Sequence, residues 1–169
     1  MRSKQHILFF LTIFMVIAAD QFTKHLVLQG IPLYKTVPLI NGFFNLTHVT
    51  NTGAAFGFLA GHEAWRYLFF LGIGGMSVLA MLIFYFKAGP HPLAVTLGLA
   101  MVSGGALGNV WDRVQLGFVV DFLDFYLGNY HWPAFNVADS AITVGGGIMA
   151  WSLIMSSGKD VSSCSSCKP

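Results

Sequence analysis

Four long apolar runs constrain this chain more than any other feature of its sequence. The hydrocarbon core of a bilayer is about 30 Å thick, and a helix needs about 20 apolar residues to cross it. The four runs cover residues 7–28, 65–86, 93–110 and 140–155. Only 9% of the 169 residues are charged, whereas soluble domains carry about 25%. We therefore expect an α-helical membrane protein with four transmembrane helices.

The first apolar run permits a second interpretation, a cleaved signal peptide. Arg2 and Lys4 precede it, as basic residues precede the apolar region of a signal peptide. Cleavage would then follow Ala19, but Ile17 occupies the position where a small residue is preferred. We therefore expect an uncleaved helix.

The length of the chain predicts one domain followed by a short tail. Residues 1–157 fit a single membrane-embedded domain. Residues 158–169 are polar, and we expect a disordered cytoplasmic tail. Cys164 and Cys167 lie in this tail, where no second pair completes a metal site. Acylation and metal binding by these cysteines stay open as alternatives.

The charges of the loops indicate an orientation. Four spans place both termini and the turn at Lys87 on one side, with five of the nine Lys and Arg residues. The margin is small, but the short loop and the N-terminus favour cytoplasmic termini. Six of the seven acidic residues then lie on the outer side. A net charge of +2 and the absence of a basic run argue against nucleic acid binding.

Irregular structure is expected in the two outer stretches, residues 29–64 and 111–138, because backbone in lipid must satisfy its own hydrogen bonds. Asn41-Gly42 is a turn signal, and the alternation over 44–48 is typical of a half-buried strand. We therefore predict a small sheet on the outer membrane surface. Gly104 with Gly108 and Ala141 with Gly145 predict close helix packing.

Two aspartates stand in unusual surroundings. Asp121 lies between Val119-Val120 and Phe122-Leu123, and Asp139 begins the fourth apolar run. Taken alone, Asp121 fits an interfacial charge that reaches water, and Asp139 fits an acid favoured by a helix N-terminus. Both fall on the outer side, and the loop between them is short enough to bring them together. Acids at membrane depth are costly and are often functional.

Two adjacent carboxylates suggest hydrolysis of a peptide bond. They cannot both ionise easily, so they share one proton. One carboxylate then deprotonates a water while the other hydrogen-bonds the substrate carbonyl. A serine or cysteine nucleophile is disfavoured because no Gly-x-Ser-x-Gly motif occurs. The histidines show no metal-binding spacing, so we expect no metal and no cofactor.

Several further motifs accompany these aspartates. They are Asn-Thr-Gly-Ala-Ala-Phe at 51–56, Gly-Gly-Ala-Leu-Gly-Asn at 104–109 followed by Asp112-Arg113, Val-Val-Asp-Phe at 119–122, and Phe-Asn-Val-Ala-Asp-Ser at 135–140. Together they resemble, in order and over nearly the whole chain, the signature blocks of bacterial lipoprotein signal peptidase, also called signal peptidase II.

The resemblance implies an aspartyl endopeptidase of the bacterial inner membrane, with its active site near the periplasmic face. Such an enzyme removes the signal peptide from diacylglyceryl-modified prolipoproteins, cutting on the N-terminal side of the lipidated cysteine. The implied fold has four transmembrane helices, a small periplasmic β-cradle and a short extramembrane helix. The implied partners are prolipoprotein substrates, membrane lipid and the inhibitor globomycin, and we expect a monomer.

The resemblance also assigns residues. Asp121 and Asp139 match the catalytic dyad. The residues that match other characteristic positions around the site are Asp20, Asn51, Gly105, Asn109, Arg113, Asn136 and Ala138.

The chemistry of these residues leaves several roles open. The asparagines suit hydrogen bonds to the substrate backbone or to the carboxylates. Arg113 suits a backbone carbonyl, a lipid phosphate or an acid such as Asp20, and it also fits a cation that reaches the interface. Asp20 and Lys24 have the spacing of an i,i+4 ion pair. The glycines of segment 51–61 suggest a moving flap.

Two other classes of function remain as alternatives. A proton-coupled transporter would place acids along a path across the bilayer, but the second to fourth apolar runs contain no acid. A non-catalytic lipid-binding or assembly factor would keep its function when Asp121 is replaced by Asn. A peptidase would lose it.

Overall fold

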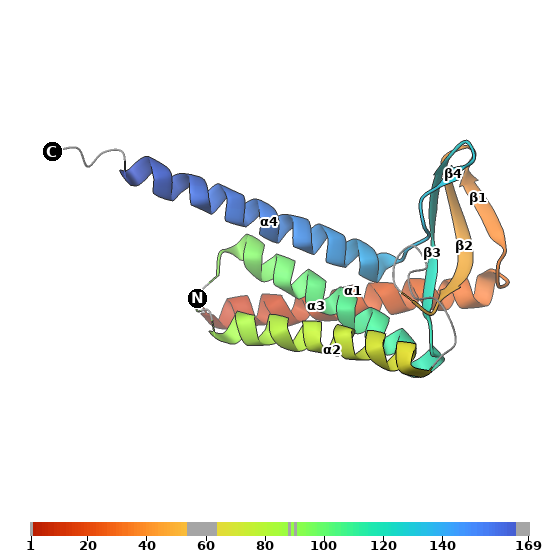
Figure 1. The fold of residues 1–169 in the computed structure, drawn as a ribbon, viewed down its shortest axis with the longest axis horizontal. Coiled ribbons are helices and arrows are strands. Elements are labelled where there is room, and N and C mark those ends of the chain that lie inside the picture. The colour runs from red at the N-terminus through yellow and green to blue at the C-terminus, as the bar shows by residue number, and fades with distance from the viewer. Residues whose placement is uncertain (1, 54–63, 88, 90, 165–169) are drawn as a thin grey trace.

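Four long helices and a small antiparallel sheet form the part of the chain that the computed structural model describes, residues 2–53, 64–87, 89 and 91–164 (Figure 1). Each helix contains a segment long and apolar enough to cross a bilayer. The helices are α1 (Arg2–Gly30), α2 (Ala64–Lys87), α3 (Leu93–Leu116) and α4 (Val137–Cys164). The predicted four-helix membrane architecture is confirmed.

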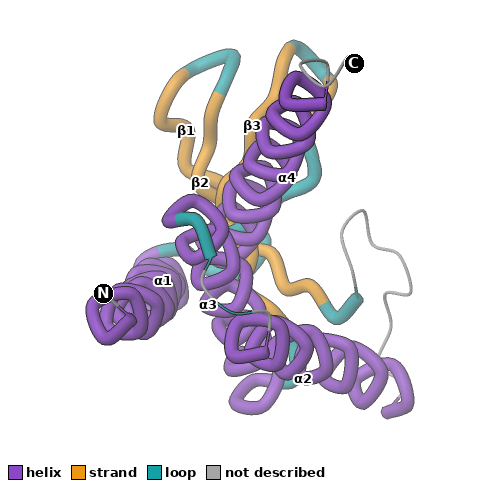
Figure 2. The backbone as a smooth tube through the Cα atoms, turned by 90° about the vertical axis from the view of Figure 1, so that its left-hand side faces the viewer, coloured by secondary structure: helices purple, strands orange, loops and turns teal. Residues whose placement is uncertain are grey.

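Helix α3 lies at the centre of the bundle and packs against α1, α2 and α4 (Figure 2). Small residues permit this close approach where lipid gives helices no hydrophobic reason to associate. A Cβ at Gly104 would lie 2.9 Å from the Cβ of Val16 on α1. A Cβ at Gly145 of α4 would lie 2.7 Å from the carbonyl oxygen of Gly98. The predicted helix-packing role of these glycines is confirmed.

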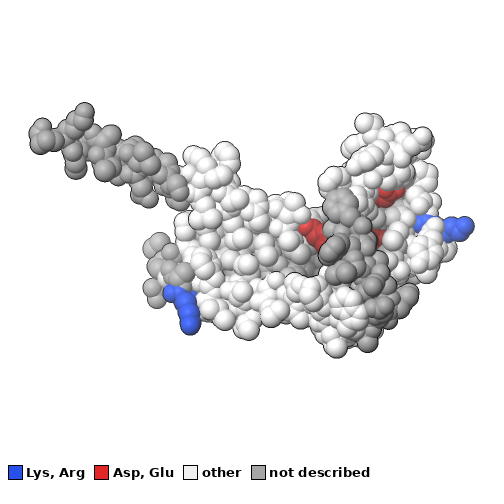
Figure 3. Space-filling model, in the orientation of Figure 1, with Lys and Arg blue, Asp and Glu red and all other residues white. Residues whose placement is uncertain are grey.

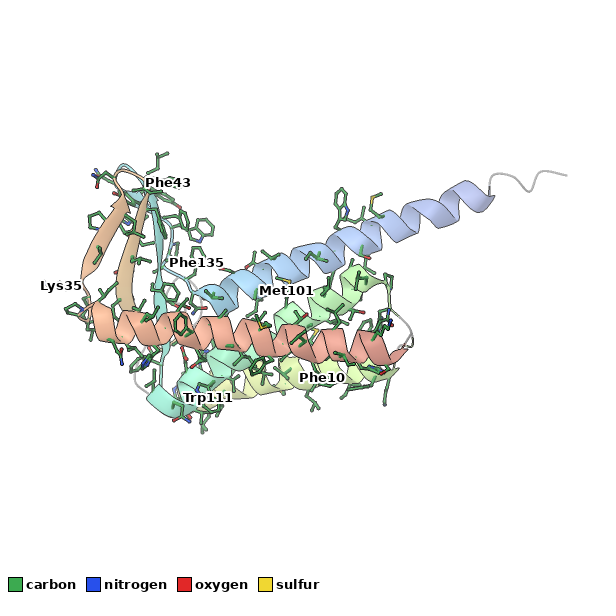
Figure 4. The ribbon with its side chains drawn as sticks, turned by 180° about the vertical axis from the view of Figure 1, so that it is seen from behind. Phe10, Lys35, Phe43, Met101, Trp111 and Phe135 are labelled. Atoms are coloured by element: carbon green, nitrogen blue, oxygen red, sulfur yellow. The ribbon has the colours of Figure 1, made fainter. Side chains whose placement is uncertain are left out.

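The bundle is apolar outside and partly polar inside, as expected for a protein dissolved in lipid. Large apolar side chains such as Phe10 on α1 and Trp111 on α3 are about half exposed (Figure 4). Thr96, Ser103 and Asp112 of α3 are buried instead. The helices therefore bury polar groups against one another and offer apolar side chains to the bilayer.

The sheet stands at one end of the bundle (Figure 1). Its strands are β1 (Thr36–Ile40), β2 (Phe44–Asn51), β3 (Val119–Leu127) and β4 (Tyr130–His131), paired in that order and antiparallel. The predicted turn at Asn41-Gly42 joins β1 to β2, with Gly42 at a φ of 83° that favours glycine. The predicted strand over 44–48 is confirmed and continues to Asn51.

Helix α3 is longer than the sequence predicts. The span was expected to end at Val110, with an outer stretch from residue 111, but the helix continues to Leu116. Asp112 and Arg113 therefore lie on a helix rather than in a loop. Gly117 ends the helix at a φ of 81°, and its N–H donates to the Arg113 carbonyl. The chain then enters β3 directly.

Helix α4 also exceeds its predicted span, because it runs on to Cys164. Residues 158–164 of the predicted disordered tail are therefore helical here, while residues 165–169 lie outside the described part. The division of the chain at residue 157 stays a prediction. A short extramembrane helix is not found within the described ranges, and most of the predicted flap falls in 54–63, also outside them.

Candidate active site

Backbone pairing brings Asp121 and Asp139 to the same place. Asp121 lies on β3, and Asp139 lies in the first turn of α4. The segment before α4 pairs with β3, since the N–H groups of Phe122 and Leu123 both donate to the Phe135 carbonyl. The N–H of Phe135 donates back to the Leu123 carbonyl. The start of α4 is therefore fixed beside the buried part of β3.

Asn136 connects the two aspartates. Its side-chain Nδ2 donates to Asp121 Oδ1 at 2.7 Å, and its backbone N–H donates to Asp139 Oδ2 at 3.3 Å. Its Oδ1 accepts a hydrogen bond from the Asp139 backbone N–H at 2.9 Å. This reciprocal pattern is a capping box at the start of α4. Because Asn136 is fully buried, it links the two carboxylates rigidly.

Asp121 is buried and receives two amide hydrogen bonds. Asn136 donates to one carboxylate oxygen, and Asn51 of β2 donates to the other at 3.0 Å. Burial, followed by the charge of Asp139, raises the pKa of Asp121 to about 7. The hydrogen bonds from Asn51 and Asn136 and the charge of Lys24 oppose this increase. Asp121 is therefore able to hold a proton near neutral pH.

Asp139 is more accessible than Asp121 and is half-buried. Its Oδ1 accepts a hydrogen bond of 2.7 Å from Asn109 Nδ2 on α3. Asn109 thus contacts Asp139 from α3, while Asn136 contacts it from the segment that pairs with β3. The donors around both carboxylates are neutral amides and backbone groups.

A buried ion cluster of Lys24, Asp20 and Asp112 contacts the amide of Asn109. The ammonium group of Lys24 is 2.8 Å from both Asp20 Oδ2 and Asp112 Oδ2, and it donates to Asn109 Oδ1 at 3.0 Å. Asp20 Oδ1 also accepts a hydrogen bond from the Ala138 backbone N–H at 2.9 Å. The predicted Asp20–Lys24 pair is confirmed, and the carboxylate of Asp20 suits the positive N-terminus of α4.

Gly105 and Ala138 provide the close contact between α3 and α4 at this level. A Cβ at Gly105 would collide with the Ala138 carbonyl oxygen. Ala138 is itself fully buried. Larger side chains at these two positions would move α4, and with it Asp139, away from Asn109.

Arg113 joins α3 to the end of β2. Its guanidinium donates to the Gly53 carbonyl at 2.9 Å and to the Asn109 carbonyl at 3.2 Å. It also lies over the ring of Phe70, 5.4 Å from the ring centre. Of the roles considered for Arg113, the backbone carbonyl contact is the one found. The acid Asp20 pairs with Lys24 instead.

Hydrogen bonds and close helix contacts join all nine predicted residues into one site, at the end of the bundle that carries the sheet. Acidic side chains appear at the surface between the sheet and the helices (Figure 3). Within the described ranges, no group of three or more His, Cys, Asp or Glu side chains is placed to hold a metal ion. The arrangement offers a carboxylate with a raised pKa beside a more accessible one, as acid–base hydrolysis of an amide requires.

Comparison with known proteins agrees with this chemistry. The family model described as signal peptidase (SPase) II matches residues 12–155 of the 169-residue chain. This chain belongs to the signal peptidase II family.

Relatives named lipoprotein signal peptidase cover most of the chain. The protein of Desulforapulum autotrophicum is 48% identical over 147 residues, which is 86% of this chain and 91% of the relative. The protein of Burkholderia mallei is 51% identical over 132 residues, 77% of each chain.

Two solved structures, both described as bacterial membrane enzymes, share the fold. The first has a TM-score of 0.81 at 32% identity and covers 89% of this chain and 90% of its own. The second has a TM-score of 0.76 at 33% identity and covers 86% of this chain and 91% of its own.

Sequence reasoning missed three residues of this signal peptidase II site. Lys24 was considered only as an ion-pair partner of Asp20, and Asp112 was given no role. Gln21 also joins them, since its Nε2 donates to Asp112 Oδ1 at 2.8 Å. One feature of the sequence could have revealed this cluster. Lys24, Asp20 and Asp112 are charged residues on helices whose other faces are apolar. Charges buried in a helical bundle need partners.

Proposed function

We propose that this chain removes the signal peptide from prolipoproteins, with Asp121 and Asp139 as its catalytic acid and base. The observation that carries the proposal is the pair of carboxylates joined through Asn136, one buried with its pKa raised to about 7 and one accessible. Membership of the signal peptidase II family supplies the reaction. The substrate we propose is a prolipoprotein whose cysteine carries diacylglycerol, cut on the N-terminal side of that cysteine.

The protonation states follow from the surroundings of each carboxyl group. Asp121 holds the shared proton, donates a hydrogen bond to the scissile carbonyl oxygen and transfers the proton to that oxygen during the attack on the carbonyl carbon. Asp139 acts as the base and takes a proton from a water, whose oxygen attacks the carbonyl carbon. Asp139 then passes that proton to the leaving nitrogen, and the C–N bond breaks as Asp121 recovers its own proton. The amides of Asn51, Asn109 and Asn136 hold both groups without adding charge.

The position of the site suits a substrate that is itself partly in lipid. A signal peptide that spans the bilayer places its cleavage point near the interface, and the site lies where the helices meet the sheet (Figure 1). The diacylglyceryl chains remain in the bilayer while the peptide reaches the polar groups. Membrane lipid is therefore part of the binding environment.

The proposed orientation places the termini in the cytoplasm and the dyad near the periplasmic face of the inner membrane. Lys4 and Lys87 are both exposed at the end of the bundle opposite the sheet. Short loops rich in Lys and Arg favour the cytoplasmic side. The sheet and the dyad then face the periplasm.

Cleavage of a diacylglyceryl-modified prolipoprotein by the purified protein tests the proposed reaction. We expect cleavage by the parent and loss of more than about a thousandfold in Asp121→Asn and Asp139→Asn, because neither remaining carboxyl can perform both proton transfers. Asp124→Asn is the matched control, since Asp124 is a buried acid of the same strand that binds Asn45 and His131 instead.

Each other result has a distinct meaning. If both dyad variants cut as well as the parent, the assignment of the dyad is wrong. If the folded parent cuts nothing, transport or lipid binding becomes the better interpretation.

Inhibition and oligomeric state belong to the same proposal. We expect a globomycin-type cyclic peptide to block cleavage competitively, because it would bind at the dyad. We expect the detergent-solubilised protein to be a monomer, because all nine site residues come from one chain. Light scattering of the active fraction measures this directly.

A further inference from the structure

The buried ammonium of Lys24 has no free hydrogen-bonding capacity. An ammonium offers three donors and no acceptor, and Lys24 contacts the carboxylates of Asp20 and Asp112 and the Oδ1 of Asn109. The Lys24 side chain is only 2% exposed. Two of these contacts neutralise charge, whereas the third goes to a neutral amide that itself contacts Asp139.

The contact with Asn109 determines which way its carboxamide faces. A carboxamide has an acceptor oxygen at one corner and a donor NH₂ at the other. Because Lys24 only donates, the oxygen must face Lys24, and the NH₂ is directed to Asp139 Oδ1 at 2.7 Å. The reversed amide would place donor against donor at Lys24 and oxygen against carboxylate at Asp139. Asn136 Nδ2 also lies 3.3 Å from Asn109 Oδ1 and favours the same orientation.

We propose that Lys24 is a positioning residue for the dyad, holding the Asn109 amide so that its N–H groups meet Asp139. The inference rests on the proposed function, because it assigns Lys24 a part in the same reaction. Lys24 touches neither carboxylate of the dyad and acts through Asn109.

Lys24 also contributes positive charge close to Asp121. That charge lowers the pKa of Asp121 against the larger effects of burial and of Asp139. Loss of the ammonium therefore moves the deprotonation of Asp121 to higher pH. The charged groups around Asp121 are Asp139 on α4, Lys24 and Asp20 on α1, and Asp112 and Arg113 on α3.

A purely structural lysine would behave differently. If Lys24 only holds α1 against α3 through Asp20 and Asp112, its loss lowers stability and leaves the turnover of the folded fraction unchanged. A positioning residue changes kcat and the pH profile of folded enzyme. The experiment must therefore separate folding from turnover.

The test compares Lys24→Met with the charge-balanced pair Lys24→Met/Asp112→Asn in the full-length protein, assayed on diacylglyceryl-modified prolipoprotein. The single variant leaves two buried carboxylates without their cation and can fail to fold, whereas the pair removes one charge of each sign. Asp112→Asn alone controls for the second change. Lys35→Met controls for loss of a lysine at an exposed position, labelled in Figure 4.

We expect the kcat of the charge-balanced pair to be about tenfold or more below that of Asp112→Asn. The KM values of these two variants should agree within about twofold. We expect the alkaline limb of its pH profile to move to higher pH. Adding Asn109→Ala should cause little further loss, because Lys24 and Asn109 act as one unit. Lys24→Arg keeps the positive charge, so its alkaline limb should stay at the parental position.

A folded charge-balanced pair with the kcat and pH profile of Asp112→Asn overturns the inference. The inference is also overturned if adding Asn109→Ala to the charge-balanced pair lowers kcat by a further factor as large as Asn109→Ala causes on its own. Lys24 would then act independently of Asn109. If the alkaline limb of Lys24→Arg moves as far as the limb of the Met variants, the displacement is not caused by loss of the positive charge. If the parent itself does not cleave, the proposed function fails and the inference fails with it; if the parent cleaves and only these expectations fail, the proposed function stands.

Discussion

At the scale of single residues, the site uses neutral amides where charged donors would be the obvious choice. Asn51 and Asn136 donate to Asp121, and Asn109 donates to Asp139. An adjacent cation would hold Asp121 ionised, because an opposite charge nearby strongly favours the charged form. The amides orient the carboxylates, and those of Asn51 and Asn136 have a smaller effect on the pKa of Asp121 than its burial has. A proton thus remains available near neutral pH.

The pH dependence of cleavage reports this proton. With the pKa of Asp121 at about 7, kcat/KM should decrease above about pH 7, approaching tenfold per pH unit, as the proton is lost. Asn51→Ala removes a hydrogen bond that lowers this pKa, so its alkaline limb should move to higher pH. The measurement is kcat/KM from pH 5 to 9 for both proteins. An unchanged alkaline limb in Asn51→Ala would show that this limb does not report the deprotonation of Asp121.

The same carboxyl group affects stability. Its pKa is raised in the folded protein, so the folded state prefers the protonated acid and loses stability as pH increases from about 4 to 7. Asp121→Asn removes this loss and should unfold at a higher temperature than the parent above pH 7, because its neutral side chain has no charge to desolvate. The difference should disappear near pH 4. Thermal unfolding in detergent at pH 4.5 and 7.5 measures it.

At the scale of elements, the interface between α3 and α4 decides where Asp139 lies. Gly105 faces the Ala138 carbonyl, and Gly98 faces Gly145 further along the same two helices. The carboxylate of Asp20 holds the first turn of α4 through the Ala138 N–H. The position of Asp139, the proposed catalytic base, is thus set by contacts between helices.

Gly105→Val tests this interface. Its Cβ would meet the Ala138 carbonyl oxygen inside van der Waals distance, so we expect a loss of about 1–3 kcal/mol in stability and a large loss of cleavage. Gly147→Ala of α4 is the matched control, because a Cβ there meets nothing within 4 Å. Thermal unfolding and cleavage of the two variants give the comparison. A Gly105→Val protein with parental stability would show that α4 can shift without cost.

At the scale of the whole molecule, the polar chemistry is concentrated at one end. The sheet, the dyad and the buried ion cluster share that end, while Lys4 and Lys87 lie at the other. A proton path across the bilayer would need acids distributed along the helices. Five of the acids, Asp20, Asp112, Asp121, Asp124 and Asp139, lie toward the end near the sheet instead.

Cysteine labelling tests the proposed orientation in the membrane. In a background with Cys164 and Cys167 replaced by Ser, a membrane-impermeant maleimide applied to spheroplasts should label Lys35→Cys and leave Lys87→Cys unlabelled. Both lysines are exposed in the structure, so access differs only through their side of the membrane. After lysis both should react. Labelling of Lys87→Cys in intact spheroplasts would reverse the orientation.

The sequence alone determined the membrane class and the four spans, and its resemblance to signal peptidase II predicted nine residues of the site. Long apolar runs leave the chain few alternatives to helices across a bilayer, because backbone in lipid must pair with itself. Asp139 was predicted at the start of the fourth helix from local sequence, because an acid suits a helix N-terminus. The boundaries were less certain, and the predicted end of α3 was wrong because a polar helical turn at the interface resembles a loop.

Only the tertiary structure revealed how Asp121 is held. Its strand β3 is buried on both faces over 119–122, so it shows no alternation that would distinguish a strand from an apolar loop. The cluster of Lys24, Asp20 and Asp112 was equally hidden, because it joins α1 to a residue 88 positions away on α3. Such contacts depend on how the helices cross, and a crossing is decided by packing of the whole bundle rather than by local sequence.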